Sequence, residues 1–358
     1  MQIATTPSLT ATKEEIDAYL YAYSERRIKD AERIGASYVR LRKSIDTLIR
    51  NGGKRLRPHL VLTIFRAYAP EKELASILPA AAAQELIHLA MLIHDDIIDR
   101  DLVRYGAPNI AGEYEAYYAA HATQPFDHRH TALSAALLAG DALIADAHQI
   151  LRKTQQPPHL VQQAEDILSQ SIFDVIGGEL LDTEGTILTK DAASPLTIAE
   201  HKTSSYSFVG PLTTGAVLAD APEADVMLLS RLGKHLGIGY QLTDDLLGTF
   251  GDEQKTGKSA SGDIKEGKRT FLIEEFTRLG SESQQADFFA IFHRDNTTDA
   301  EIARARALLY ESGAVKAVED HIGIHKQHCD AIIEGLSVAD EYKQALHTFV
   351  SACLKRES

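Results

Sequence analysis

Four aspartates follow an apolar run closely. Asp95, Asp96, Asp99 and Asp101 come directly after residues 89–93. If this segment is a helix, the carboxylates of Asp95 and Asp99 lie one turn apart on the same face. Such carboxylates repel one another unless a cation lies among them, and Mg²⁺ suits this place because it binds carboxylate oxygens, keeps water and bridges to phosphate. The alternative is a solvated acidic helix end.

A second acidic cluster favours the metal site over that alternative. Asp244 and Asp245 also follow an apolar helical segment, and Asp252 comes two turns beyond Asp244 on the same helix face. Two such clusters on two long helices could face each other across a bundle interior and hold several divalent ions between them. The pair of clusters therefore indicates a divalent metal centre.

Basic side chains gather beside a glycine pair in the motif GGKRLRP, residues 52–58. Lys54, Arg55 and Arg57 stand there, and Pro58 can open a helix. A flexible backbone with Lys and Arg at a helix start suits a phosphate group, which Arg can bind with two hydrogen bonds. The alternative is an exposed basic loop.

Further candidates for anion binding are spread along the chain. They are the lysines Lys202, Lys258 and Lys268, and the histidine His88. His88 comes seven residues before Asp95, so it falls on the same helix face and could donate a hydrogen bond to a phosphate oxygen. The alternative for a single helix histidine is a packing role.

The elements that must position these side chains are helices. Between residues 73 and 103 the apolar positions recur at helical intervals and cover more than one face, which is typical of a central helix in a bundle. Strand-like alternation is scarce. Further helices are expected at residues 10–50, 133–153, 159–182, 198–209, 224–250, 298–333 and 338–354. We therefore predict an all-α fold with one large helical domain over residues 1–358.

Composition restricts the class of partner. The 358 residues include 37 Lys+Arg and 51 Asp+Glu, a net charge of -14, which argues against a nucleic-acid or anionic-membrane binder. Two cysteines, Cys329 and Cys353, are too few for a disulfide framework and favour a reducing cytoplasm. The opening segment has no apolar core, and no uninterrupted apolar run is long enough for a membrane span. We expect a soluble, cytoplasmic protein without a membrane segment.

Seven motifs, taken in order, resemble those of the trans-type isoprenyl diphosphate synthases, also called polyprenyl synthetases. They are GGKRLRP, ELIHLAMLIHDDIID, LLAGDALIADA, GGELLDTEG, HKTSSYSFVGPL, GIGYQLTDDLLGTFGD and TGKSASGDIKEGKRT. The resemblance covers roughly residues 48–270. It implies a helical bundle around a deep central cavity, usually a homodimer. It also implies a prenyltransferase that joins isopentenyl diphosphate to an allylic diphosphate, head to tail, with release of pyrophosphate.

The resemblance also implies roles for individual residues. Asp95 and Asp99 would hold Mg²⁺ against the allylic diphosphate, and Asp244 would complete the ion cluster; with Lys202 these are the implied catalytic residues. Contacts to the allylic substrate would come from Arg104, Lys202, Thr203, Gln241, Lys258 and Lys268. Isopentenyl diphosphate would be held by Lys54, Arg57 and His88.

Two positions depart from the family pattern. Tyr105 stands where a second arginine usually follows Arg104, and Gly248 replaces the third acid of a second DDxxD motif. These departures support an alternative, a non-catalytic or regulatory subunit of a heteromeric synthase. A terpene cyclase shares the aspartate motif, but GGKRLRP would have no purpose there.

Product length depends on residues that precede Asp95. A product that grows alongside this helix passes positions one to two turns before Asp95, namely Ala90, Met91 and Ile87. In the family a bulky aromatic directly before the first acidic motif tends to stop growth at farnesyl length. None of the three is aromatic, so we expect products of geranylgeranyl length or longer.

Overall fold

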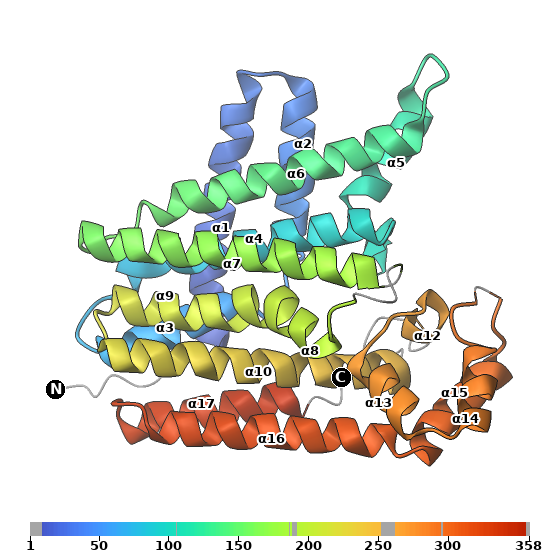
Figure 1. Ribbon diagram of the computed structural model, residues 1–358. Coiled ribbons are helices and arrows are strands. Elements are labelled where there is room, and N and C mark those ends of the chain that lie inside the picture. Colours follow the sequence, from blue (N-terminus) through green and yellow to red (C-terminus); the bar gives the residue numbers. More distant parts are fainter. Residues whose placement is uncertain are drawn as a thin grey trace. The chain divides into compact units, whose positions relative to one another are not determined.

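The computed structural model describes residues 9–104, 106–185, 187, 192–251, 262–294 and 296–355, and these are almost entirely helical (Figure 1). The strands among them are two short ones, β1 (Val103–Arg104) and β2 (Ala107–Pro108), which pair antiparallel. The predicted all-α fold class is confirmed. The chain divides into two compact units, residues 1–170 with 210–226 and residues 171–209 with 227–358. The single domain over residues 1–358 stays a prediction.

The first unit contains the elements up to the start of α7, together with α9. They are α1 (Leu9–Glu32), α2 (Ala36–Arg50), α3 (Leu56–Tyr68), the 3-10 turn η1 (Leu74–Ile77), α4 (Leu78–Ile98), α5 (Ile110–His121), α6 (His128–Leu151) and α9 (Gly210–Leu218). Helix α7 (Pro158–Gly185) begins in this unit.

Helix α4 is the centre of the first unit, packed on α6, α3, α9 and α1. Its alanines Ala80–Ala83 are fully buried, as expected for a helix that is apolar on more than one face. Close approach to α6 depends on Gly140, where a Cβ would lie 2.1 Å from Nε2 of His94. The basic and acidic motifs are therefore positioned by one packed helical core.

Residues 74–98, which comprise η1 and α4, are long and apolar enough to cross a membrane. Our sequence-based expectation overlooked this segment. In the protein, 72% of the most apolar part of this segment is buried. The segment is therefore apolar because it is a core helix.

The second unit contains the end of α7 and the elements after it. They are α8 (Pro195–Ile198), the π-helix η2 (Ala199–Val209), α10 (Glu223–Phe250), α12 (Gly262–Glu266), α13 (Phe271–Leu279), α14 (Glu282–Phe289), α15 (Asp299–Glu311), α16 (Ala314–Glu334) and α17 (Asp340–Leu354). Helix α10 begins at the boundary, and residues 227–250 of it belong here.

Glycines let η2 lie directly against α10 in this unit. A Cβ on Gly237 would lie 2.3 Å from Oγ of Ser204, and one on Gly233 would lie 2.7 Å from the backbone of Val209. The remaining helices close around a core that contains Phe271, Phe276 and other apolar side chains. The π-helix that carries Lys202 is thus held tightly along the helix that carries Asp244.

Several expected helices differ from those observed. The segment 10–50 breaks at Gly35, whose φ of 140° favours glycine, and 298–333 breaks at Gly313 with φ 84°. Helices α5, α9, α12, α13 and α14 were not predicted from the sequence. In α13 and α14 the runs are only nine and eight residues long, too short for a clear helical period.

Candidate active site

The acidic motif lies at the carboxyl end of α4. The N–H of Asp99, the C-cap residue, donates to the backbone oxygen of Asp95 over 2.8 Å. Helical geometry therefore continues to Asp99, which keeps the two side chains on one face. Asp99 is exposed and the Asp95 side chain is 28% exposed. Arg100, with φ 62°, ends the helix directly afterwards.

Arg104 folds back onto this acidic end. It stands on β1, which pairs with β2 in a hairpin that follows α4. Its Nη2 lies 3.2 Å from Oδ2 of Asp95 and 2.6 Å from Oδ1 of Asp96. Burial raises the pKa of Asp96, and the bond from Arg104 opposes that rise. The end of α4 thus combines buried and accessible carboxylates with a cation, which suits an ion-bridged diphosphate.

The GGKRLRP motif separates into accessible and buried cations. Lys54 is exposed and Arg57 is half-buried, whereas the Arg55 side chain is 1% exposed and bonds to Asp17 and Glu85. Our expectation of three phosphate-facing cations is therefore corrected: Arg55 is a structural residue. The accessible pair, Lys54 and Arg57, are the two that the family resemblance assigned to isopentenyl diphosphate.

His88 stands on α4 within the field of these cations. Burial, and then the charges of Arg57 and Arg104, hold its pKa well below the usual value. The imidazole is therefore neutral at pH 7, so it offers a hydrogen bond to an anion and no charge. Lys54, Arg57, His88, Asp95, Asp99 and Arg104 all belong to the first unit.

Lys202 is a candidate site residue of the second unit. It lies on η2 and its Nζ is 2.6 Å from Oδ2 of Asp182 and 3.0 Å from Oε2 of Glu179, both on α7. The two helices can meet here because Gly178 lacks a Cβ, which would lie 2.2 Å from the backbone nitrogen of Lys202. A π-helix in such a place is often found at functional sites.

A hydrogen-bonded chain connects η2 to the second aspartate motif. The hydroxyl of Thr203 donates to Oε1 of Gln241 over 2.6 Å, and Nε2 of Gln241 donates to Oδ1 of Asp245 over 2.9 Å. Burial raises the pKa of Asp245 to about 7, and the nearby charges of Asp263, Asp244 and Asp182 add to the rise. Asp244 is half-buried, so it is the more accessible acid of the pair.

Gly248 has a packing explanation. A Cβ at this position would lie 2.3 Å from Oδ2 of Asp263, which comes from α12. The space that a third aspartate of the motif would enter is therefore filled by another carboxylate. This packing offers a structural reason for glycine at position 248 that does not depend on loss of activity.

We expect Gly248→Asp to destabilise the protein by about 1–3 kcal/mol, because a new side chain meets a filled space and adds a like charge. Thermal unfolding would measure the loss. Gly248→Ala should also destabilise the protein, but much less in an Asp263→Ala background. Equal losses in both backgrounds would contradict the contact, as would a gain in turnover for Gly248→Asp.

Sequence reasoning missed the acidic partners Glu179, Asp182 and Asp263. The first two stand three residues apart in GGELLDTEG, a motif that carried the resemblance but no assigned role. Their helical spacing beside two glycines was the available signal.

Lys268 is half-buried and lies 3.2 Å from Oε2 of Glu266. Lys258, Tyr105 and Asp252 lie outside the described residues.

The positions expected to limit product length have different environments. Ala90 and Ile87 are 0% and 1% exposed, so they are packed and line no space that water can enter. Met91 is partly exposed and lies one turn before Asp95 on the same face. The structure therefore corrects the expectation for Ala90, whose small size serves helix packing, and leaves Met91 as the position to test.

Carboxylates and cations are the groups available to hold a ligand in these sites. Within the described ranges, no three His, Cys, Asp or Glu side chains form a group that could hold a metal ion by themselves. The donors at Asp95, Asp99 and Asp244 are carboxylate oxygens, which fit Mg²⁺, an ion that completes its coordination with water and substrate phosphates.

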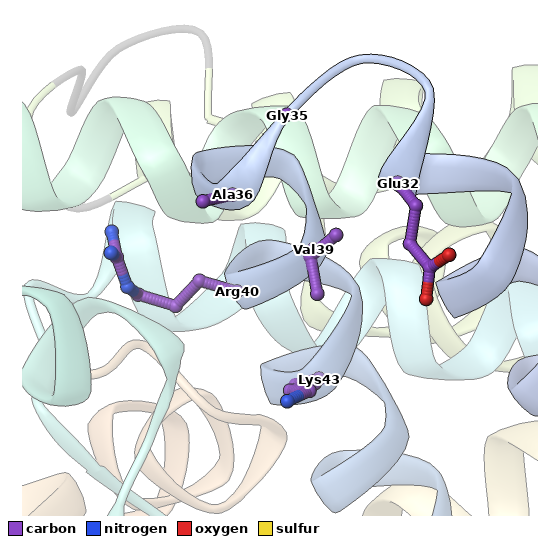
Figure 2. Close-up of a pocket in the computed structure, with 6 residues that line it drawn as sticks. All are labelled: Glu32, Gly35, Ala36, Val39, Arg40 and Lys43. Atoms are coloured by element: carbon purple, nitrogen blue, oxygen red, sulfur yellow. The ribbon is translucent and has the colours of Figure 1, made fainter.

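A pocket at the turn between α1 and α2 is separate from these residues. It has a volume of about 520 Å³, and Figure 2 shows its lining residues: Glu32, Gly35, Ala36, Val39, Arg40 and Lys43. The guanidinium of Arg40 lies 3.7 Å from the centroid of the Tyr117 ring. No predicted site residue lines this pocket, so it is not the candidate active site.

Comparison with known proteins gives a consistent result. The profile of the family described as polyprenyl synthetase matches residues 39–309. A geranylgeranyl diphosphate synthase of Methanosarcina mazei is 32% identical over 280 residues, 78% of this chain and 79% of the relative. A geranylfarnesyl diphosphate synthase of Aeropyrum pernix is 28% identical, covering 86% of this chain and 92% of the relative.

Among solved structures, the geranylgeranyl pyrophosphate synthase of Corynebacterium glutamicum, complexed with isoprenyl diphosphate and magnesium, superimposes with a TM-score of 0.90. It is 30% identical and covers 98% of this chain and 100% of its own. The similarity of fold thus extends over nearly the whole chain. By sequence and by fold, this chain belongs to the polyprenyl synthetase family and is a trans-type prenyltransferase.

Proposed function

We propose that this prenyltransferase condenses isopentenyl diphosphate with an allylic diphosphate, head to tail and with Mg²⁺, to give a product of geranylgeranyl length or longer. One observation carries the proposal. Each unit holds carboxylates beside a cation that pairs with them, Arg104 with Asp95 and Asp96, and Lys202 with Glu179 and Asp182. Such mixed sites suit a diphosphate bridged by divalent ions.

We assign magnesium binding to Asp95 and Asp99 in the first unit and to Asp244 in the second, because carboxylate oxygens are the ligands that this ion prefers. When bound, the ion neutralises the diphosphate and stabilises the charge that develops on it as it leaves. The related synthase of Corynebacterium glutamicum, whose structure contains magnesium and isoprenyl diphosphate, supports the choice of magnesium as the ion. Breakage of the allylic C–O bond leaves a carbocation and a pyrophosphate.

The chain's own cations take part in the same step. In this proposal Lys202 and Arg104 neutralise the departing pyrophosphate, and Lys258 and Lys268 belong to this set by family resemblance. Lys54, Arg57 and the neutral His88 hold isopentenyl diphosphate. Its double bond attacks the carbocation to form the new C–C bond. The released pyrophosphate can take the proton that is then lost, so no dedicated side-chain base is required.

The test is incubation of the purified chain with isopentenyl diphosphate, Mg²⁺ and each allylic primer in turn, followed by sizing of the products. We expect chain elongation by the chain alone. No product with any primer would favour the alternative, a regulatory subunit of a heteromeric synthase. Farnesyl diphosphate as the sole product would contradict the proposed length.

We expect Met91→Phe to shorten the product, because an aromatic ring one turn before Asp95 blocks the path of a growing chain on that face. Turnover with short primers should be retained, and product sizing measures the shift. Ala90→Phe is the contrast. It introduces a ring at a fully buried position and should lower the melting temperature, at a cost of about 1–3 kcal/mol. An unchanged product distribution in folded Met91→Phe would place Met91 away from the product.

We also propose a homodimer. Helix α7 exposes three large apolar side chains at helical spacing: Phe173 is 74% exposed, and Ile176 and Leu180 are each 56% exposed. An apolar stripe of this kind is typical of a protein interface. Light scattering should give a mass twice the 39.2 kDa of one chain. A mass of one chain at micromolar concentration would contradict the dimer.

We also propose that the protein is located in the cytoplasm and has no membrane segment. This proposal is supported by the burial of the candidate helix at residues 74–98 and by the two cysteines, Cys329 and Cys353, which are buried and form no disulfide. Fractionation of cells into soluble and membrane pools would test it.

A further inference from the structure

Arg55 stands in the middle of the loop that joins α2 to α3, between the two cations assigned to isopentenyl diphosphate. It is the N-cap residue of α3 and has φ 53° and ψ 41°, the left-handed region that a non-glycine residue rarely adopts. Its side chain is 1% exposed. Arg55 therefore cannot contact a substrate, and its unfavourable backbone conformation must be held by other contacts.

Three acceptors surround its guanidinium. Nε donates to Oδ1 of Asp17 and Nη1 donates to Oε1 of Glu85, each over 2.8 Å. Nη2 donates to the backbone oxygen of Ile49 in the last turn of α2. The contacts come from α1, α4 and α2, so one side chain connects three helices to the loop.

The loop is built closely around that guanidinium. A Cβ on Gly52 would lie 2.0 Å from Nη1 of Arg55 and 2.2 Å from its Cζ. At the neighbouring Gly53 a Cβ would meet nothing within 4 Å. Of the two glycines, only Gly52 is therefore required by the position of Arg55.

The two neighbouring cations of the motif are more exposed than Arg55. Lys54 is exposed, and Arg57, in the first turn of α3, is half-buried. The charge of Arg57 contributes to the lowered pKa of His88, which places the two side chains within electrostatic reach. Fixing Arg55 thus fixes the direction in which Lys54 and Arg57 leave the backbone.

We propose that Arg55 is a positioning residue for isopentenyl diphosphate, and that Asp17 extends this role to α1. This inference rests on the proposed assignment of Lys54, Arg57 and His88 to that substrate. Helix α1 precedes residues 39–309, the part that the family profile matches. A helix outside the matched region therefore contributes to the affinity for one of the two substrates.

The test compares adjacent glycines. Gly52→Ala displaces the guanidinium and should raise KM for isopentenyl diphosphate on the order of tenfold, with KM for the allylic substrate within about twofold. Gly53→Ala, the matched control, should leave both within about twofold. Asp17→Asn keeps the side-chain size but removes the charge, and should raise the same KM by about threefold.

Two further measurements separate positioning from a general loss of stability. Amide hydrogen exchange at residues 51–56 should speed up in Gly52→Ala and Asp17→Asn but stay unchanged in Gly53→Ala and Tyr68→Phe. Tyr68→Phe removes a bond of 2.8 Å to Asp225 at the far end of α3, so it controls for destabilisation of the same helix. Its two KM values should change equally, if at all.

Unchanged exchange in the loop of Gly52→Ala and Asp17→Asn would overturn the proposal, and so would equal changes in both KM values. If the unaltered chain makes no product with any primer, the proposed function fails. In that case loop exchange still reports whether Asp17 and Gly52 hold Arg55, and calorimetric binding of isopentenyl diphosphate replaces KM as the substrate readout.

Discussion

Asp95→Ala or Asp99→Ala is expected to lower turnover by a factor on the order of 10³ while the fold is retained. Each change removes an accessible carboxylate from one face at the end of α4. Neither residue belongs to the packed core, so the melting temperature should change little. Loss of one carboxylate even reduces the repulsion between these acids when no metal is present.

Asp101→Ala is the matched control. Asp101 is an exposed acid of the same segment, two residues beyond Asp99, so it tests whether overall negative charge matters. Its turnover should stay within about threefold of the unaltered protein, the range of a surface substitution. Excess chelator should stop the reaction, and the apparent Kd for Mg²⁺ in the presence of pyrophosphate should rise in Asp95→Ala. Full activity in chelator would contradict the metal assignment.

The end of α4 could be predicted from sequence because its information is local. A spacing of four residues fixes which carboxylates share a helix face, whatever surrounds them. The apolar character of the helix also identified it as central. The same reasoning located both ends of α10 and α17 to within two residues, but it joined α1 to α2 and α15 to α16, because Gly35 and Gly313 are single interruptions.

The role of Arg55 could not be predicted, because it depends on residues distant in sequence. Asp17 and Glu85 are 38 and 30 positions away, and nothing in GGKRLRP distinguishes a buried arginine from its exposed neighbours. Gly248 is a similar case. From sequence it is a missing carboxylate, and only the contact with Asp263 explains it. Local spacing predicts which side chains share a face, whereas partner choice requires the tertiary structure.

The partners of Lys202 are also known only from the tertiary structure, and their role can be tested by substitution. Lys202 and Lys234 each connect η2 to a neighbouring helix: Lys202 bonds to Glu179 and Asp182 on α7, and Lys234 of α10 bonds to Glu200 over 2.7 Å. Their environments differ. The Lys234 side chain is 52% exposed, whereas that of Lys202 is 24% exposed beside two acids and Thr203.

Lys202→Ala is expected to lower kcat/KM for the allylic substrate by a factor on the order of 10²–10³, because a cation that stabilises the departing pyrophosphate is lost and Glu179 and Asp182 keep their negative charge. The loss should appear mainly in kcat, since charge on the leaving group is greatest in the transition state.

Lys234→Ala, which also breaks a contact between η2 and another helix, should stay within about threefold of the unaltered protein, because an exposed ion pair contributes little. Lys202→Arg should recover part of the activity, because the charge is kept but the fit beside Gly178 is changed. Equal losses for Lys202→Ala and Lys234→Ala would mean that both lysines act only by holding the π-helix in place.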